Sequence, residues 1–147
     1  MSLLTREHIS RVSSLLLTCI QQLAEKSILH DKSKLEDPEK PIFDEYEKKL
    51  KGLEYGSDEY KATLEEMKPA IKHHYEVNRH HPEHYENGMK GMNLLDLLEM
   101  FCDWKAAGER HETGDIKKSI EVNQKRFGYS DDLKEIFLNT AELLKDS

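Results

Sequence analysis

The sequence predicts a single all-α domain, a helical bundle of about six helices that covers residues 1–147. Apolar residues recur at steps of three and four, and no stretch alternates polar and apolar residues for long enough to form a strand. A chain of 147 residues also suits one hydrophobic core. Each interruption of the helical pattern is a short turn signal, so brief loops should join the helices.

Three helices are expected in the first half of the chain. The first takes Thr5 as its N-cap and ends near Ser27. Its apolar face consists of Ile9, Val12, Leu16, Cys19 and Leu23. The second covers about residues 38–55, because Asp followed by Pro supplies a cap and a first helical residue. The third follows the Ser57 cap and covers about residues 58–79.

Three more helices are expected in the second half. Asn93 caps a strongly apolar helix that runs through about Ala107. Residues 115–127 and 130–144 form two amphipathic helices, and Gly128 separates them.

Composition excludes several classes of protein. The net charge of −7 argues against a general nucleic-acid binder, which needs a basic surface. The longest apolar stretches, such as residues 94–98, are far shorter than the roughly 20 residues that cross a bilayer. The start lacks the features of a secretory signal, so we expect a cytoplasmic protein without membrane association. Cys19 and Cys102 lack CxxC spacing and are expected to be buried free thiols.

Histidines cluster in one part of the chain. Five of the eight lie within twelve residues, and they are His73, His74, His80, His81 and His84. Neutral imidazole is the commonest metal ligand in proteins, so the cluster favours a metal site in an acidic protein. The alternative is a solvated polar loop, because a short His-rich tract is only compositional support.

Helical position adds to this prediction for two histidines. His74 continues the apolar face of the third expected helix and should point inward. His8 shares a face with Val12, Leu15 and Cys19, so it should be buried as well. A single buried histidine is more often a satisfied core residue than a ligand, but two in one small core favour a metal site.

The apolar helix that begins after Asn93 carries three carboxylates on one stripe, Asp96, Glu99 and Asp103. If the stripe faces water, it is an ordinary solvated face. If it faces the core, a cation must offset the desolvation of the carboxylates. Either a metal ion or a basic side chain would serve, and the candidates for the latter are Arg79, Lys105 and Arg110.

An adjacent His30–Asp31 pair follows two apolar residues, and Lys34 comes three positions after the aspartate. Neighbouring side chains diverge by about 100° on a helix, but at a helix end they can approach one ion from two directions. By itself this pair is weak support for a metal site. It supports one more strongly together with an inward histidine upstream and an inward aspartate downstream.

These residues resemble the HD-domain superfamily of metal-dependent phosphohydrolases, all-helical proteins whose ligands follow the order H, HD, D. His8 matches the first histidine, and His30 and Asp31 match the pair. Asp103 in MFCDW matches the final aspartate, and Lys34 matches the lysine of HDxxK.

The resemblance covers roughly residues 8–107. Further histidines resemble the additional ligands of members that hold two or more metals, and they are His74, His80, His81 and His84. The motifs HDKSK, NRHHPEHY and DLLEMFCDWKA together resemble an uncharacterised family of bacterial and phage proteins.

The resemblance implies an HD-like fold and hydrolysis of a nucleotide or other small phosphoester by a water that a divalent ion activates. One or two ions are implied, and mixed His and carboxylate ligands favour Mn, Fe, Co, Ni or Zn, with Mg as an alternative. Catalytic roles then fall to Asp31, Lys34 and Glu99, and phosphate binding to Lys34, Arg79 and Lys105. For each of these cations the alternative is ordinary surface charge. Asp96 or Glu99 is either an alternative ligand or a partner that orients the ligands.

Three functions from different classes follow from these residues. The first is the phosphohydrolase. The second is an HD-type di-iron oxygenase, which iron content and oxygen-dependent turnover would distinguish. The third is a non-catalytic metal-binding helical protein, which saturation of every metal position by side chains would favour, because catalysis needs an open position for water.

Overall fold

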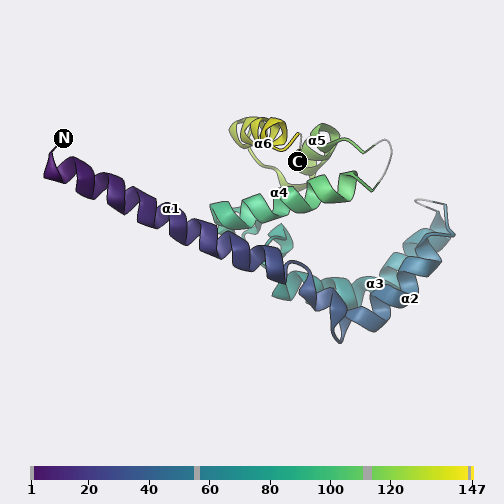
Figure 1. Ribbon diagram of the computed structural model, residues 1–147. Helices are drawn as coiled ribbons and strands as arrows, with labels where there is room; N and C mark the ends of the chain where they lie inside the picture. The colour runs from purple at the N-terminus through teal and green to yellow at the C-terminus, as the bar shows by residue number, and fades with distance from the viewer. Residues whose placement is uncertain (1, 55–56, 111–113, 146) are drawn as a thin grey trace.

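The computed structural model describes residues 2–54, 57–110, 114–145 and 147. In these residues six α-helices and three short 3-10 helices follow one another, and none of these residues is in a strand. The elements are α1 Leu3–Leu29, η1 Lys32–Leu35, α2 Glu39–Leu50, α3 Asp58–Val77, η2 Pro82–His84, η3 Gly88–Gly91, α4 Leu94–Gly108, α5 Ile116–Phe127 and α6 Asp131–Leu143. The prediction of an all-α fold is confirmed (Figure 1).

Helix α1 is long, and its N-terminal half stands away from the rest of the molecule (Figure 1). It begins earlier than the sequence predicted, because the Ser2 hydroxyl accepts a hydrogen bond from the Thr5 backbone N–H at 3.2 Å and caps the helix. Thr5 is therefore inside the helix. No residue of α1 is buried, and its C-terminal end contacts α4 through Lys26 and His30.

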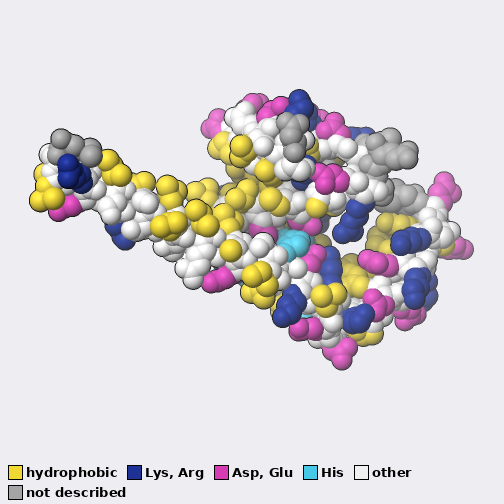
Figure 2. Space-filling model, in the orientation of Figure 1, with side chains coloured by type: hydrophobic (Ala, Val, Ile, Leu, Met, Phe, Trp, Pro, Cys, Tyr) yellow, Lys and Arg dark blue, Asp and Glu magenta, His cyan; other side chains and the backbone are white. Residues whose placement is uncertain are grey.

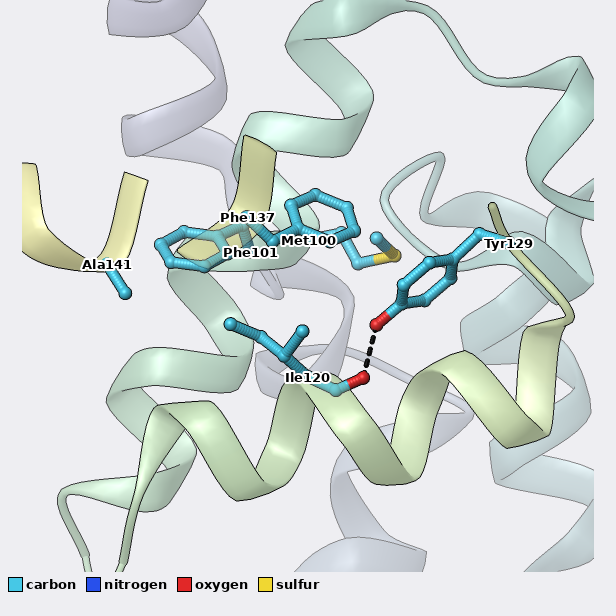
Figure 3. Packing of buried hydrophobic residues seen from close by; sticks show 6 residues of the cluster. All are labelled: Met100, Phe101, Ile120, Tyr129, Phe137 and Ala141. Atoms are coloured by element: carbon cyan, nitrogen blue, oxygen red, sulfur yellow. Dashed lines mark hydrogen bonds between the residues drawn. The ribbon is translucent and has the colours of Figure 1, made fainter. Parts of the chain in front are cut away.

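The main apolar core lies between α4, α5 and α6. Figure 3 shows its buried members, which are Met100, Phe101, Ile120, Tyr129, Phe137 and Ala141. Phe101 and Ile120 are fully buried, and each buried side chain of this kind contributes about 1.5–3 kcal/mol of hydrophobic stabilisation. The Tyr129 hydroxyl donates a hydrogen bond to the Ile120 carbonyl, which satisfies the only polar atom of that side chain.

Local signals set the ends of these three helices as predicted. The Asn93 side chain accepts hydrogen bonds from the backbone N–H groups of Leu95 and Asp96, and the Asp96 carboxylate accepts one from Asn93 in return. This capping box begins α4. Gly128 ends α5 with φ of 68°, a left-handed conformation that glycine adopts without steric cost. Ser130 then caps α6.

Helices α2 and α3 form a hairpin at the C-terminal end of α1, on the side away from the core of α4, α5 and α6 (Figure 1). The Ser57 hydroxyl caps α3 by accepting a hydrogen bond from the Tyr60 backbone N–H at 3.1 Å. Met67, Ala70 and His74 are buried along one face of α3, as its predicted periodicity required. This face brings His74 toward the end of α1.

Both cysteines are free but exposed, so the prediction of buried thiols is wrong. The apolar neighbours of Cys19 belong to an uncovered helix, and Cys102 lines an open groove described below. Among the described helices, none combines the length and apolar character that crossing a membrane requires.

Candidate metal centre

The end of α1 carries the adjacent pair His30 and Asp31. The helix stops at Leu29, His30 is its C-cap, and Asp31 has φ 54° and ψ 16°. Asp31 is the one non-glycine residue with positive φ among those the structure describes. Such a conformation costs about 1 kcal/mol or more for a residue with a Cβ and is enriched at functional sites. It turns the two side chains toward the same space.

Histidines from α3 and the following loop meet Asp31 there. The Nε2 atoms of His74 and His81 are 3.0 Å apart. Asp31 Oδ1 lies 3.2 Å from His74 Nε2 and 3.4 Å from His80 Nε2. Asp31, His74, His80 and His81 thus form one group whose potential ligand atoms all lie within 4.8 Å of one another.

A second group shares Asp31 and includes the aspartate of α4. Asp31 Oδ2 lies 3.7 Å from His30 Nε2, and Asp103 Oδ1 lies 3.8 Å from the same nitrogen. Asp103 Oδ2 is also 4.0 Å from His80 Nε2. The two carboxylate oxygens of Asp31 therefore face two neighbouring groups of potential metal ligands. Oδ1 faces His74 and His80, and Oδ2 faces His30.

Glu39, the first residue of α2, fixes the orientation of His74. Its side chain has no exposed surface, and Oε2 accepts a hydrogen bond from His74 Nδ1 at 2.9 Å. Oε1 accepts one from His73 Nδ1 at 2.7 Å, and the Ser33 hydroxyl donates to Oε2 at 3.0 Å. When His74 is neutral and donates from Nδ1 to Glu39, its Nε2 presents a lone pair to the cluster.

Glu99 orients the rings of His30 and His80 in the same way. Its Oε1 accepts a hydrogen bond from His30 Nδ1 at 3.1 Å and lies 3.2 Å from His80 Nδ1. Lys26 holds the other oxygen with a hydrogen bond of 2.8 Å. The Nε2 atoms of His30 and His80 are thereby directed at Asp31 and Asp103. Hydrogen bonds from the outer ring nitrogen of a histidine to a carboxylate are typical of metal sites.

The separations match what one ion would impose. Two ligand atoms that each lie about 2.1 Å from an ion are about 3.0 Å apart at a right angle and about 3.4 Å apart at the tetrahedral angle. The three contacts of the first group lie in this range, at 3.0, 3.2 and 3.4 Å. Moreover, Asp31 Oδ1 and His80 Nε2 are buried and have no hydrogen-bond partner among the described residues. A cation would satisfy both atoms.

Charge in the cluster also suits a cation. Burial, together with the charge of His80 and His74, lowers the pKa of His81 to about 3, so this ring is neutral. Burial would raise the pKa of Asp31, but the nearby rings of His74 and His80 and the Lys34 ammonium hold that pKa well below its usual range. The carboxylates of Asp103 and Glu99 raise the pKa of His30 to about 10. A bound divalent ion would replace protons as the positive charge among these carboxylates.

Asp96 is buried but has cations of its own. Lys26 donates to Oδ1 at 2.9 Å, Arg79 donates to Oδ2 at 3.1 Å, and the Tyr85 hydroxyl donates to Oδ2 at 2.9 Å. The desolvation of a buried carboxylate on α4 could be offset by a metal ion or by basic side chains. At Asp96 the structure has basic side chains, Lys26 and Arg79. Asp96 belongs to none of the groups of potential ligands among the described residues, and Arg79 is engaged with it.

Two of the predicted histidine ligands lie outside the cluster. His8 is on the exposed part of α1, 22 residues before His30 and so roughly 33 Å from it along the helix. It was expected to face a core because of its apolar neighbours, but those neighbours are themselves exposed. His84 Nδ1 donates instead to the Tyr75 carbonyl at 3.0 Å. Neither belongs to a group of potential ligands among the described residues.

The two candidate phosphate-binding lysines differ in position. Lys34 donates to Asp31 Oδ2 at 2.6 Å and is 41% exposed, so it lies at the edge of the cluster. Lys105 pairs with Glu109 on α4 and lines a cavity with residues of α5 and α6. Its position two residues after Asp103 turns it to the opposite side of the helix, so its assignment to the site is corrected.

Sequence reasoning missed Glu39 and the groups around it. Asn78 donates to the His74 carbonyl at 2.8 Å and to the Ser33 hydroxyl at 2.9 Å, which ties α3 to η1. Glu39 follows a proline and resembles any acidic first-turn residue, so the sequence offers no sign of its burial. Lys26 was missed because nothing before the fold is known places it opposite α4.

The model of a family described as a family of unknown function (DUF5662) matches residues 2–146. No curated protein and no solved structure matches the chain significantly.

Proposed function

The chain belongs to this family of unknown function, DUF5662, and we propose from its own geometry that it is a metal-dependent phosphohydrolase with an HD-like centre. The observation that carries the proposal is the convergence of His30, Asp31 and Asp103 with the histidines of α3 and its loop. Their potential ligand atoms form groups within 4.8 Å. Two members carry buried atoms without a hydrogen-bond partner among the described residues. Figure 2 shows histidine side chains at this junction beside acidic ones.

The donor set favours a transition metal or zinc. Imidazole nitrogens from His30, His74, His80 and His81 join two aspartates, and imidazole suits Zn, Fe, Co, Ni and Mn better than Mg. The two groups share Asp31, so one or two ions fit. Such an ion, when bound, lowers the pKa of a water and polarises a phosphoryl oxygen.

An open edge supports catalysis over a purely structural ion. The side chains of His30 and Asp103 are 31% and 30% exposed, whereas those of His74 and His80 are nearly buried. Water and a small substrate therefore reach the cluster from the side of His30 and Asp103. A structural site is closed by its protein ligands, whereas a catalytic site keeps an accessible position.

Lys34 is the residue of this chain best placed to hold a phosphate. It lies at the edge of the cluster, bonded to Asp31 and partly exposed. An ammonium group attracts a phosphate oxygen as a point charge. Asp31 then positions Lys34 through Oδ2 while its Oδ1 faces the first group. Glu99 acts by orienting His30 and His80 rather than by touching substrate.

The test begins with metal content. Elemental analysis of protein purified without a His tag should find about one or two divalent ions per chain, and a screen of phosphoesters with that metal should find turnover. The double variant His30→Ala/Asp31→Ala should lose tight metal binding and retain its helical circular dichroism. The control His8→Ala should retain the metal, because His8 lies far along α1. Unchanged stoichiometry in the double variant would overturn the proposed centre.

A second candidate, an HD-type di-iron oxygenase, is favoured by one observation. Four imidazoles and two carboxylates arranged around a shared Asp31 can hold two ions side by side. Iron in the purified protein, with oxygen consumption and no phosphoester turnover, would select this alternative. Metal without either activity would leave a non-catalytic metal-binding protein.

A further inference from the structure

Helix α1 carries a continuous apolar face, most of which is left exposed by the residues that the structure describes. Its members recur at alternating steps of three and four residues, and we call them the α1 seam: Ile9, Val12, Leu16, Cys19 and Leu23. Ile9 is 53% exposed and Leu16 59% exposed. The same spacing continues to Lys26 and His30, which face α4 in the same chain. The seam is thus the continuation of a packing surface beyond the edge of the body (Figure 2).

The composition of this helix does not suit solvent. No charged residue occurs in residues 12–24, although 35% of the whole chain is charged. Leu15 and Ile20 flank the seam and are 49% and 59% exposed. A solvated helix needs a charged outer face over its whole length, whereas a seven-residue repeat of apolar positions is typical of helices that pair with another helix.

The total surface points to a missing partner of substantial size. The chain has a mass of 17.2 kDa and an accessible surface of 10811 Å². A compact monomer of this mass exposes about 7,800 Å², so the excess is about 3,000 Å². If each of two copies covered half of its excess, the dimer would bury about 3,000 Å² in total, which is the range of permanent homodimers.

A groove for that partner lies beside the seam, between α1 and α6 over α4. Its cavity has a volume of about 550 Å³. The apolar side chains that line it, which define the α1–α6 groove, are Leu23, Leu98, Cys102, Ala106, Leu143 and Leu144. Leu143 is 80% exposed. The polar end of the groove reaches His30 and Asp103. Apolar walls suit a helix better than a charged phosphoester.

We propose that the chain forms a two-fold symmetric homodimer in which the N-terminal half of α1 from each copy lies in the α1–α6 groove of the other. The occupant is a second copy because the uncovered seam and the uncovered groove are both apolar and both lie on α1. A two-fold axis across the middle of α1 covers both surfaces in both copies at once. A parallel pair of α1 helices would cover the seams but leave the grooves open.

The repeat gives the register of the pair. In an antiparallel pair, Leu16 packs against Cys19 of the other copy, and Val12 packs against Leu23 of the other copy. Helix α1 has 27 residues and is about 40 Å long, so its first turn then reaches the end of the partner's helix. Thr5 of each copy lies beside His30 of the other, and the dimer forms a wall of the metal centre.

Sedimentation equilibrium of the full chain tests the proposal. The wild-type protein should be a dimer at micromolar concentration. Leu16→Glu should weaken the dimer at least about 30-fold, because it buries a charge in the middle of the interface. Ser14→Glu adds the same charge on the opposite face of α1 and should change the dissociation constant less than about threefold. Both positions are exposed in one chain, so circular dichroism should show no loss of helix.

A groove variant separates this arrangement from a simple helix pair. Leu143→Glu, on α6, should weaken the dimer at least about tenfold, because the partner's α1 covers that side chain. A monomeric wild-type protein would overturn the proposal, and so would a dimer that Leu16→Glu leaves intact. Dissociation by Leu16→Glu without any effect of Leu143→Glu would overturn the occupancy of the groove. Binding of the monomer to phosphatidylcholine vesicles through the seam would replace the second copy by a membrane surface.

Discussion

Replacing Glu39 by Gln should weaken metal binding without removing a ligand. The two oxygens of Glu39 accept hydrogen bonds from His73 Nδ1 and His74 Nδ1 at 2.7 and 2.9 Å, and the side chain has no exposed surface. A glutamine offers one acceptor oxygen and places an amide donor at the other position, so one ring N–H loses its acceptor. When the amide nitrogen faces His74, this ring no longer prefers a lone pair on Nε2.

The expected loss of affinity is between about tenfold and a hundredfold, the range for removing the carboxylate partner of a metal-bound histidine. This corresponds to about 1.4–2.8 kcal/mol of binding free energy. Removal of the ring itself, as in His74→Ala, should cost more, because it deletes a donor of the group that contains Asp31, His80 and His81. The ordering of the two variants distinguishes an orienting residue from a ligand.

Competition with a chromophoric chelator at fixed pH measures this affinity for Zn or Mn. Glu47→Gln is the matched control, because Glu47 is exposed on the same helix. Circular dichroism of the three proteins checks that α2 and α3 remain folded. If Glu39→Gln bound metal as tightly as Glu47→Gln, then the hydrogen bond from His74 to Glu39 would not orient the ring, and the assignment of Nε2 as the ligand atom would be wrong.

Two further predictions concern stability. The metal found in the purified protein, added at a hundred times its dissociation constant, should stabilise the fold by about 2.7 kcal/mol. That raises Tm by roughly 5–10 °C for a chain of this size; scanning calorimetry measures the shift, and a Tm that chelator does not lower would contradict it. Burial would raise the pKa of Asp96, but hydrogen bonds with Lys26 and its other partners hold that pKa below its usual range. Its charge therefore stabilises the fold above about pH 4, and this contribution is lost as the pH falls through the folded pKa. Asp96→Asn should accordingly cost about 3 kcal/mol at pH 7 and less at pH 3 in urea titrations, and an equal cost at both pH values would refute the role of the charge.

The helices of the second half of the chain were predictable because their signals are local. The Asn93 cap with Asp96, the left-handed Gly128 and the Ser130 cap act within a few residues of the sequence. The start of α1 was placed three residues too late, because the sequence offers two competing local cap signals there. Both Ser2 and Thr5 are good caps, and the two leucines between them allow the helix to begin at the earlier one.

The candidate site was predictable where the proposed ligands are distinctive residues. His30, Asp31, His74 and Asp103 stood out as inward or paired residues, and the structure brings them together. The residues that orient them did not stand out. Glu39 accepts hydrogen bonds from residues 34 and 35 positions later, so its role depends on the packing of α2 against α3 and on no pattern near it.

The assignment of His8 failed for a different reason, which bears on the proposed dimer. A helical face of apolar residues predicts burial, but the pattern is the same whether the covering surface comes from the same chain or from another. Along α1 the repeat is unbroken from Ile9 to His30, yet α4 covers only its end. The prediction of burial in the core of the same chain is therefore wrong for this part of α1, and the proposed dimer accounts for its periodicity as a packing surface. In the proposed antiparallel register His8 lies next to Ser27 of the other copy, close to the metal centre but still outside it.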